Sequence, residues 1–239
     1  MNCNEKVKNI CVCWGYEEEN GPEVWGQLNP EYRICDTGIH QSPINIVNPK
    51  PTKLPAIDFN YQSTSLNIDN TGNTIQVVYP KGSWIEVNET KYHLLQFHFH
   101  APSEHTVVGS LSDMEMHFVH KSENDALAVI AVLIENGRYN TAFDPIWRHL
   151  PSVAGESEQI ADVVFNAMDL LPSTRHTYRY DGSLTTPPCS EEVKWFVMTT
   201  PIEMAQSQIA AFKAIMRGNN RPVQPLNGRE LLVDTIENR

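Results

Sequence analysis

The chain has 239 residues, of which 41% are hydrophobic and 20% charged, a globular composition that can bury a sizeable core. Its formal net charge is −11 and it has no basic cluster. A nucleic-acid partner is therefore not expected, because phosphate contacts need grouped Lys and Arg. The longest apolar run, 126–134, covers nine residues. A membrane-spanning helix needs about 20, so no membrane span is expected.

Residues 1–13 are polar, so no signal peptide is expected in this segment. They contain Cys3, Cys11 and Cys13, and the odd total of five cysteines predicts a free thiol or an intermolecular bridge if the protein is secreted. Cys11 and Cys13 lack the two-residue gap of common zinc knuckles, so we do not expect a structural metal there. We treat 1–13 as an N-terminal extension and 14–239 as one domain.

Short runs rich in Val, Ile, Phe and Trp, each bounded by turn residues, predict strands. In chain order they are residues 65–68, 74–79, 84–87, 92–100, 114–120, 126–135 and 193–199. Helical patterns are fewer, at 143–150 and at 207–217, where Ser207 is the expected N-cap. The predicted fold class is mainly β (α+β): a single domain around a large, twisted, mostly antiparallel central sheet with short peripheral helices.

Two of the predicted strands carry histidines in matching phase. Side chains alternate between the faces of a strand, so Gln96, His98 and His100 project together. Glu115 and His117 share a face of the other strand in the same way. If the strands pair, three histidines converge.

Three neutral imidazoles suit zinc and leave its fourth tetrahedral position open, which is typical of a catalytic site. Gln96 and Glu115 each precede a histidine by two residues, where they can fix the orientation and tautomer of its ring. The alternative is ordinary use, because histidines are also common in cores and on surfaces. The spacing alone leaves the reaction open.

Several collinear motifs resemble those of the α-class carbonic anhydrases, in particular the bacterial secreted or periplasmic type. They are Gln96-Phe-His-Phe-His100, Ser103-Glu-His-Thr106, Glu115-Met-His-Phe-Val-His120 and Ser183-Leu-Thr-Thr-Pro-Pro188, with supporting matches at 14–16, 20–23, 41–45 and 220–225. The resemblance covers nearly the whole chain.

The resemblance implies a zinc lyase, carbonate dehydratase, in which zinc-bound hydroxide hydrates carbon dioxide reversibly to bicarbonate and a proton. The implied zinc ligands are His98, His100 and His117, with Gln96, Glu115 and His105 in contact with them. In the implied catalytic pair, Thr185 accepts a hydrogen bond from the hydroxide and donates one to Glu104.

The implied substrate pocket has a polar and an apolar side. The Thr185 N–H faces a substrate oxygen, and Thr186 adjoins bicarbonate. The apolar wall for carbon dioxide comprises Val119, Val129, Leu184 and Trp195, and Tyr16 joins the ordered water. Taken singly, each of these residues also fits an ordinary turn, proline-stiffened loop or core position. Sulfonamides and anions are expected inhibitors, and a homodimer is the expected assembly.

The chain departs from the family pattern at one position. Fast members carry a proton-shuttle histidine where this chain has Asn73, which has no titratable proton near neutral pH. Relay of the proton needs a group that titrates near the working pH, so we expect slower, buffer-limited turnover. The candidate substitutes are His40, His93, His149 and His176.

Cys35 and Cys189 match the pair that is bridged in many secreted or periplasmic members, and the alternative is two reduced, buried thiols. A bridge requires an oxidising compartment, so the expected location is periplasmic or secreted, with a leader removed. Two other functions remain open: a catalytically silent binding protein on the same fold, and ester hydrolysis as a side activity.

Overall fold

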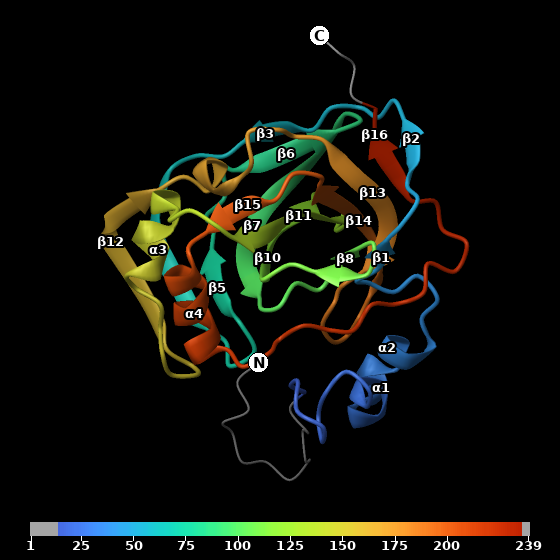
Figure 1. Ribbon diagram of the computed structural model, residues 1–239, viewed down its shortest axis with the longest axis horizontal. Coiled ribbons are helices and arrows are strands. Elements are labelled where there is room, and N and C mark those ends of the chain that lie inside the picture. Colours follow the sequence, from blue (N-terminus) through green and yellow to red (C-terminus); the bar gives the residue numbers. More distant parts are fainter. Residues whose placement is uncertain (1–13, 236–239) are drawn as a thin grey trace.

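The computed structural model describes residues 14–235, which form one large curled sheet with short helices around it (Figure 1). The strands of this sheet are β2 (Lys50–Thr52), β3 (Asp58–Asn60), β4 (Thr64–Asn70), β5 (Ile75–Val78), β6 (Trp84–Val87), β7 (Thr90–His100), β10 (Met114–Ser122), β11 (Leu127–Asn136), β12 (Ser157–Phe165), β13 (Thr177–Ser183), β14 (Glu191–Met198), β15 (Ile202–Met204) and β16 (Leu232–Asp234). The main path runs β12-β4-β5-β7-β10-β11-β14-β13-β16-β2. A smaller sheet contains β1 (Asn45–Ile46), β8 (Thr106–Val107) and β9 (Ser110–Leu111).

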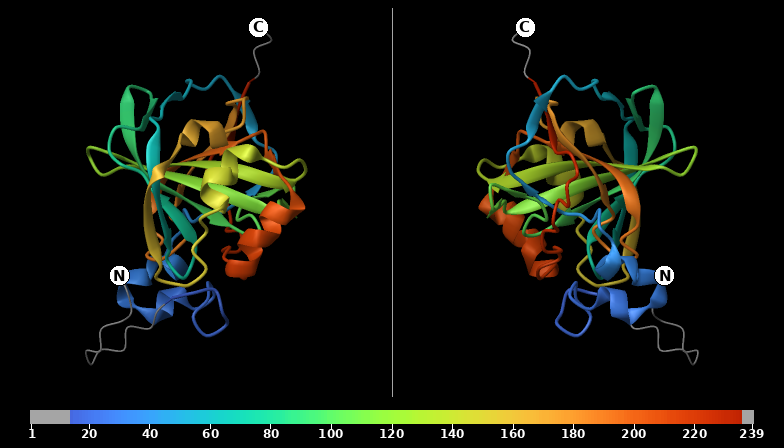
Figure 2. Two further views of the ribbon diagram at one scale, coloured as in Figure 1. Left: turned by 90° about the vertical axis from the view of Figure 1, so that its left-hand side faces the viewer. Right: turned by 90° about the vertical axis from the view of Figure 1, so that its right-hand side faces the viewer.

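The helices are short and lie outside the sheet. They are α1 (Trp25–Leu28), α2 (Ile34–Thr37), α3 (Asp144–Trp147) and α4 (Gln206–Ile215), with 3-10 turns η1 (Pro30–Tyr32), η2 (Thr141–Phe143) and η3 (Ala167–Leu170). In both views of Figure 2, α1 and α2 lie at the end of the molecule opposite the C-terminus. Among residues 14–235, no helix is both long and apolar enough to cross a membrane.

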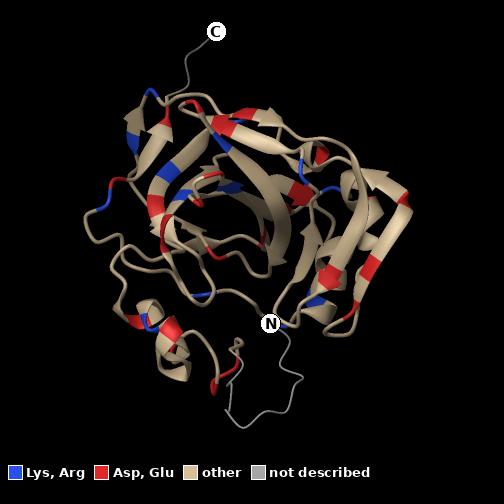
Figure 3. Cartoon of the chain, turned by 180° about the vertical axis from the view of Figure 1, so that it is seen from behind, with Lys and Arg blue, Asp and Glu red and all other residues tan. Residues whose placement is uncertain are grey.

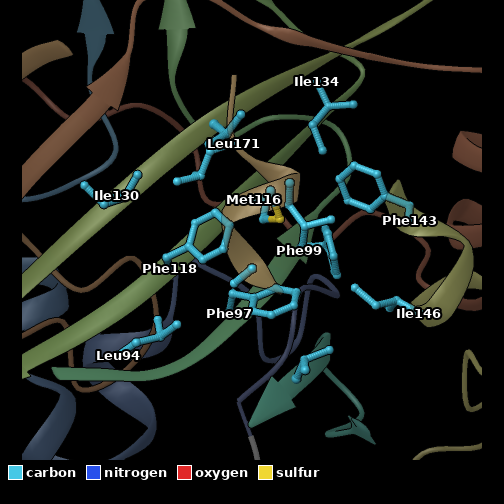
Figure 4. Close-up of a cluster of buried hydrophobic side chains, with 14 of the residues drawn as sticks. Leu94, Phe97, Phe99, Met116, Phe118, Ile130, Ile134, Phe143, Ile146 and Leu171 are labelled. Carbon is cyan, nitrogen blue, oxygen red and sulfur yellow. The ribbon is translucent and has the colours of Figure 1, made fainter. Parts of the chain in front are cut away.

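The sheet buries its main core on one face, because apolar side chains alternate along the central strands. Phe97 and Phe99 of β7 and Phe118 of β10 are fully buried there. Figure 4 shows these rings packed with Met116 and Ile130. The intervening side chains of β7 and β10 therefore project to the opposite face, which carries the predicted metal ligands.

The predicted class is confirmed, and the sheet is mixed. Antiparallel ladders join β4, β5, β7, β10 and β11, whereas β11 pairs in parallel with β14 and β15. Each of the seven predicted strands corresponds to a strand of the structure, and most ends differ by one or two residues. Among residues 14–235 the prediction missed nine strands, of which β12 and β13 are the longest. β12 is an edge strand whose side chains are mostly exposed, so it lacks a clear apolar alternation.

Both helix predictions need correction. Helical residues near 143–150 are limited to η2 and the four residues of α3. Ser207 is not the N-cap of α4, because the helix begins at Gln206 and Ala205 caps it. The backbone N–H of Ala205 instead donates to Oε1 of Gln208, at 3.1 Å. Ser207 therefore lies within the first turn.

Candidate metal centre

The register of β7 against β10 brings the three histidines together. His98 lies directly opposite His117, and His100 lies opposite Glu115. Residues opposed in this way project on the same side of the sheet. The ring centroids of His98 and His117 are 5.4 Å apart, and those of His100 and His117 are 4.6 Å apart. The pairing predicted from strand phase is thus present.

One nitrogen of each ring is occupied by a hydrogen bond within the protein. Nδ1 of His98 donates to Oε1 of Gln96 at 2.8 Å, and Nδ1 of His100 donates to the main-chain oxygen of Asn219 at 2.6 Å. Nε2 of His117 donates to Oε1 of Glu115 at 2.8 Å. Since each partner is an acceptor, these contacts fix the tautomers and leave a lone pair on each second nitrogen.

The three remaining nitrogens fit a single metal ion. One ligand nitrogen of each ring lies within 4.8 Å of those of the other two. Within the described residues 14–235, the buried Nε2 of His100 has no hydrogen-bond partner, although an unpaired buried polar atom is costly. Three neutral imidazoles are a donor set that zinc prefers. The residues present therefore fit a zinc ion with an open coordination position.

Burial keeps these rings neutral. It lowers the pKa of His98 well below its ordinary value, lowers that of His100 to about 4, and lowers that of His117. Neighbouring histidines lower the pKa of His98 further. A neutral ring retains the lone pair that metal binding requires, so the site is ready to bind metal at neutral pH.

Glu115 is held as a buried carboxylate by four hydrogen bonds. Its Oε1 accepts from His117 and from Nδ1 of His105, at 2.8 and 2.7 Å. Its Oε2 accepts the backbone N–H groups of Glu104 and His105, both at 2.8 Å. Burial raises the pKa of Glu115, but the contacts with His105 and His117 outweigh burial and hold it well below its ordinary value. Nε2 of His105 is in turn 2.7 Å from the hydroxyl of Tyr180.

Glu104 and Thr185 meet beside the three nitrogens. Oε2 of Glu104 lies 3.5 Å from Nε2 of His100 and 3.8 Å from Nδ1 of His117. Its Oε1 accepts the backbone N–H of Arg221 at 2.8 Å. Burial raises the pKa of Glu104 to about 7, while His117, the Arg221 N–H and a hydrogen bond from the Thr185 side chain act in the opposite direction.

An apolar strip borders the histidines on the same face. Val119 lies opposite Val129, and Val129 lies opposite Trp195, so the three side chains cross three adjacent strands. Leu184 packs against the same cluster. The Trp195 ring is 5.0 Å from the His117 ring. The four residues predicted as the apolar wall therefore share one cluster. Thr186 lies in the loop between Thr185 and Cys189, and its carbonyl accepts the Cys189 N–H.

The N-terminal segment closes one side of the site. Tyr16 packs with Trp14 and Trp25, and burial, followed by the charge of Glu104, raises its pKa well above the ordinary value. The side chain of Asn73 donates to the main-chain oxygen of Trp14 at 3.3 Å. Asn73 therefore ties this segment to the turn between β4 and β5.

The candidate substitute histidines lie away from the three ligands. His93 is five residues along β7 from His98, and His149 follows α3, whose Ile146 packs into the main core on the opposite face. His176 precedes β13, four strands from β7. His40 lines a separate cavity of about 650 Å³, which includes none of the three ligand histidines.

A disulfide joins Cys35 to Cys189, as predicted. Cys189 is four residues after Thr185, and the main-chain oxygen of Cys35 accepts a 2.8 Å hydrogen bond from Nη2 of Arg221. The bridge therefore adjoins both partners of Glu104. Cys3, Cys11 and Cys13 lie outside the described residues, as does the rest of the predicted extension 1–13.

Sequence reasoning missed three residues that orient the site: Asn219, Arg221 and Tyr180. Asn219 and Arg221 act through their main chains, which leave no mark in side-chain spacing, although Arg221 lies in a motif that carried the resemblance. Tyr180 lies on β13, one of the strands that the prediction missed.

Comparison with known proteins agrees with this geometry. The eukaryotic-type carbonic anhydrase family matches residues 20–235. A carbonic anhydrase of Nostoc sp. is 44% identical over 94% of this chain and 87% of its own, and one of Neisseria gonorrhoeae is 46% identical over 92% and 87%. The α-carbonic anhydrase of Thermovibrio ammonificans, solved in complex with the inhibitor sulfanilamide, superposes with a TM-score of 0.89 at 42% identity, over 92% of this chain and 98% of that one.

The family match spans residues 20–235, which is most of the chain. The sequence identities of 44% and 46% to the two bacterial relatives are high enough for them to share both its fold and its family. The chain belongs to the eukaryotic-type carbonic anhydrase family and is an enzyme of the carbonate dehydratase type.

Proposed function

We propose that this protein is a zinc-dependent carbonic anhydrase that hydrates carbon dioxide reversibly, with His98, His100 and His117 as the zinc ligands. Two observations carry the proposal: each ring has one nitrogen fixed by an acceptor, and one ligand nitrogen of each ring lies within 4.8 Å of those of the other two. Zinc held there would supply hydroxide at neutral pH, since it lowers the pKa of bound water to about 7, carbonic anhydrase itself being the reference case.

Thr185 and Glu104 are proposed to orient the nucleophile. The Thr185 side chain donates to the Glu104 carboxylate, so its oxygen keeps a lone pair for accepting a hydrogen bond from the nucleophile. A donor in that position would form no such bond. The direction of this hydrogen bond is thus proposed to orient a hydroxide that donates its proton in a hydrogen bond to Thr185, with a lone pair directed at the substrate carbon.

The strip of Val119, Val129, Leu184 and Trp195 is proposed to hold carbon dioxide. The substrate is small and apolar, so it gains from leaving water for an apolar surface. The strip adjoins His117, which places an apolar molecule beside the metal ligands. The Thr185 N–H and Thr186 are proposed to contact the oxygens of the substrate and of bicarbonate.

The test is stopped-flow hydration of carbon dioxide, with zinc measured in the same samples. We expect one zinc per chain, loss of activity with chelator, and recovery on adding zinc. His117→Ala is expected to lose zinc and activity together. Thr185→Ala is expected to keep zinc and lose about 100-fold in kcat/KM, with Thr185→Ser largely active. Zinc-loaded protein without hydration activity would instead support a silent binding protein.

Further measurements test the remaining expectations. If the zinc-loaded protein hydrolyses an activated ester but does not hydrate carbon dioxide, ester hydrolysis is its main reaction and not a side activity. Sulfonamide inhibition is proposed because the zinc position is open and the Thermovibrio ammonificans relative binds sulfanilamide. An oxidising location, periplasmic or secreted, is supported by the disulfide. The homodimer stays a prediction, which sedimentation measurements would test.

A further inference from the structure

Asn73 leaves the proton without an internal acceptor at the usual position. Its side-chain amide donates a hydrogen bond to the Trp14 carbonyl, and an amide does not gain or lose a proton near neutral pH. Hydration produces one proton for each bicarbonate, so an acceptor must be reached from the site. The following inference rests on the proposed function.

A carboxylate lies on the metal face of the sheet, in the same row as His98. Asp69 of β4 pairs with Gln76 of β5, and Gln76 pairs with His98 of β7. Directly opposed residues share a face, so the three side chains project together. Ile68 and Val77 point the other way and are fully buried in the main core. Asp69 is thus separated from His98 by one glutamine.

The distances favour Asp69 over the histidines. Adjacent strands are about 4.8 Å apart, which puts the backbone of Asp69 about 10 Å from that of His98. His93 is on the same face but five residues along β7, roughly 15 Å away at the usual rise per residue. His176 is four strands away. Water can bridge the shorter gap with two or three molecules.

The carboxylate is held in place with one oxygen free. Oδ1 of Asp69 accepts a 2.5 Å hydrogen bond from the Ser157 hydroxyl on β12. Among residues 14–235, Oδ2 has no hydrogen-bond partner and no Lys or Arg forms an ion pair with it. Asp69 is half-buried, so the free oxygen can exchange with both the site and solvent. The intervening Gln76 carries both a donor and an acceptor.

We propose that Asp69 accepts the proton released on hydration, through water beside Gln76, and passes it to a buffer base. Carbon dioxide and water give bicarbonate and a proton. The proton adds to Oδ2, which becomes a neutral carboxylic acid, and a base in solution then removes it. No oxidant or further reactant is needed. A carboxylate is a weaker base than imidazole, so this route is slower than a histidine relay.

The experiment measures ¹⁸O exchange between carbon dioxide and water in the zinc-loaded protein. It gives two rates: interconversion of carbon dioxide and bicarbonate, and proton-dependent release of labelled water. Asp69→Asn keeps an acceptor for Ser157 and removes the proton-accepting carboxylate. We expect it to lower the release rate about fivefold, leave interconversion unchanged, and respond to added imidazole more strongly than the parent protein.

The matched control is Glu158→Gln, which removes the same charge from β12. Glu158 pairs with Ile68, one position along the strand from Ser157, and is exposed. We expect both rates to stay at the parent values. An equal fall in release for both variants would show a net-charge effect and overturn the role of Asp69, as would unchanged release in Asp69→Asn.

A second readout does not depend on activity. In a joint X-ray and neutron structure of the zinc-loaded protein, we expect ordered waters linking Oδ2 of Asp69 to the three histidines past Gln76. The absence of ordered water between Asp69 and the three histidines would overturn the inference. The proposed function fails separately, if the parent protein does not interconvert carbon dioxide and bicarbonate. Normal interconversion, with a rate of labelled-water release that does not depend on Asp69, would refute only the proton relay.

Discussion

Each metal-facing histidine depends on a different kind of hydrogen-bond acceptor. His98 uses a side-chain amide, His100 a main-chain carbonyl and His117 a carboxylate. All three acceptors have the same effect: each keeps one nitrogen of its histidine ring protonated and orients the second nitrogen of that ring. Two of them precede their histidine by two residues and were predicted from strand phase. The third, the carbonyl of Asn219, was not, because every residue has a carbonyl.

At residue 73, adding a histidine should open a faster proton route. We expect Asn73→His to raise the maximal hydration rate in weak buffer about tenfold and to leave kcat/KM for carbon dioxide unchanged. Stopped-flow rates against imidazole concentration check this, because the variant should depend less on added imidazole. Buffer-independent rates in the parent protein, with no gain in the variant, would contradict it.

A second residue-scale prediction concerns His120, which is buried beside the hydroxyl of Tyr61. Burial lowers the pKa of His120 to about 3 from an ordinary 6.5. Between these values the unfolded chain binds a proton that the folded chain does not. The stability that His120 contributes is therefore complete above pH 6.5 and is lost as the pH falls towards 3.

Replacing His120 by Gln should flatten this dependence. When the pH is lowered from 7 to 4.5, the unfolding free energy of His120→Gln should fall by roughly 2 to 3 kcal/mol less than that of the parent protein. Urea unfolding of both zinc-free proteins measures the difference, and the ligand histidines contribute equally to both. Parallel pH curves would show that His120 does not titrate in this range.

At the scale of elements, the pairing of β7 with β10 builds the site and the disulfide holds its loop. The ladder between the two strands shifts register between Val119 and His120, beyond the histidine row, so His98 and His117 stay opposed. Cys189 ends the loop that carries Thr185, and its N–H donates to Thr186. The loop is thus fixed at one end by the Cys35–Cys189 disulfide and at the other by the end of β13.

Removing the disulfide should cost stability. Replacing both Cys35 and Cys189 by Ser is expected to lower the unfolding free energy by about 2 to 5 kcal/mol, because the bridge closes a long loop in the unfolded chain. Denaturant titration of the double variant checks this, and reductant should destabilise the parent protein alone. Equal stability of the two proteins would show that packing with Trp25 suffices.

At the scale of the whole molecule, one sheet separates two environments. Its main core occupies one face, and the proposed metal ligands and the apolar strip occupy the other. Acidic side chains outnumber basic ones, and Lys and Arg are scattered over several strands instead of gathering in one run (Figure 3). The packed core holds the strands that carry the three imidazoles, and in the part of the chain that the structure describes the buried Nε2 of His100 has no hydrogen-bond partner, which is costly.

Metal binding should therefore stabilise the whole fold. A ligand that binds only the folded state adds about 4 kcal/mol when present at 1,000 times its dissociation constant. We expect chelator to lower the melting temperature and zinc to restore it. In His100→Ala the zinc-dependent increase should largely disappear. Identical melting of zinc-free and zinc-treated parent protein would argue against a zinc site.

The sequence by itself determined the strand phase of the histidines, the class of fold and the resemblance to the family, because alternation and short motifs are local properties. Only the tertiary structure decided which acceptors the rings use, where the four candidate substitute histidines lie and that Asp69 shares a row with His98. These depend on register between strands distant in the chain, and register is fixed by packing of the whole sheet.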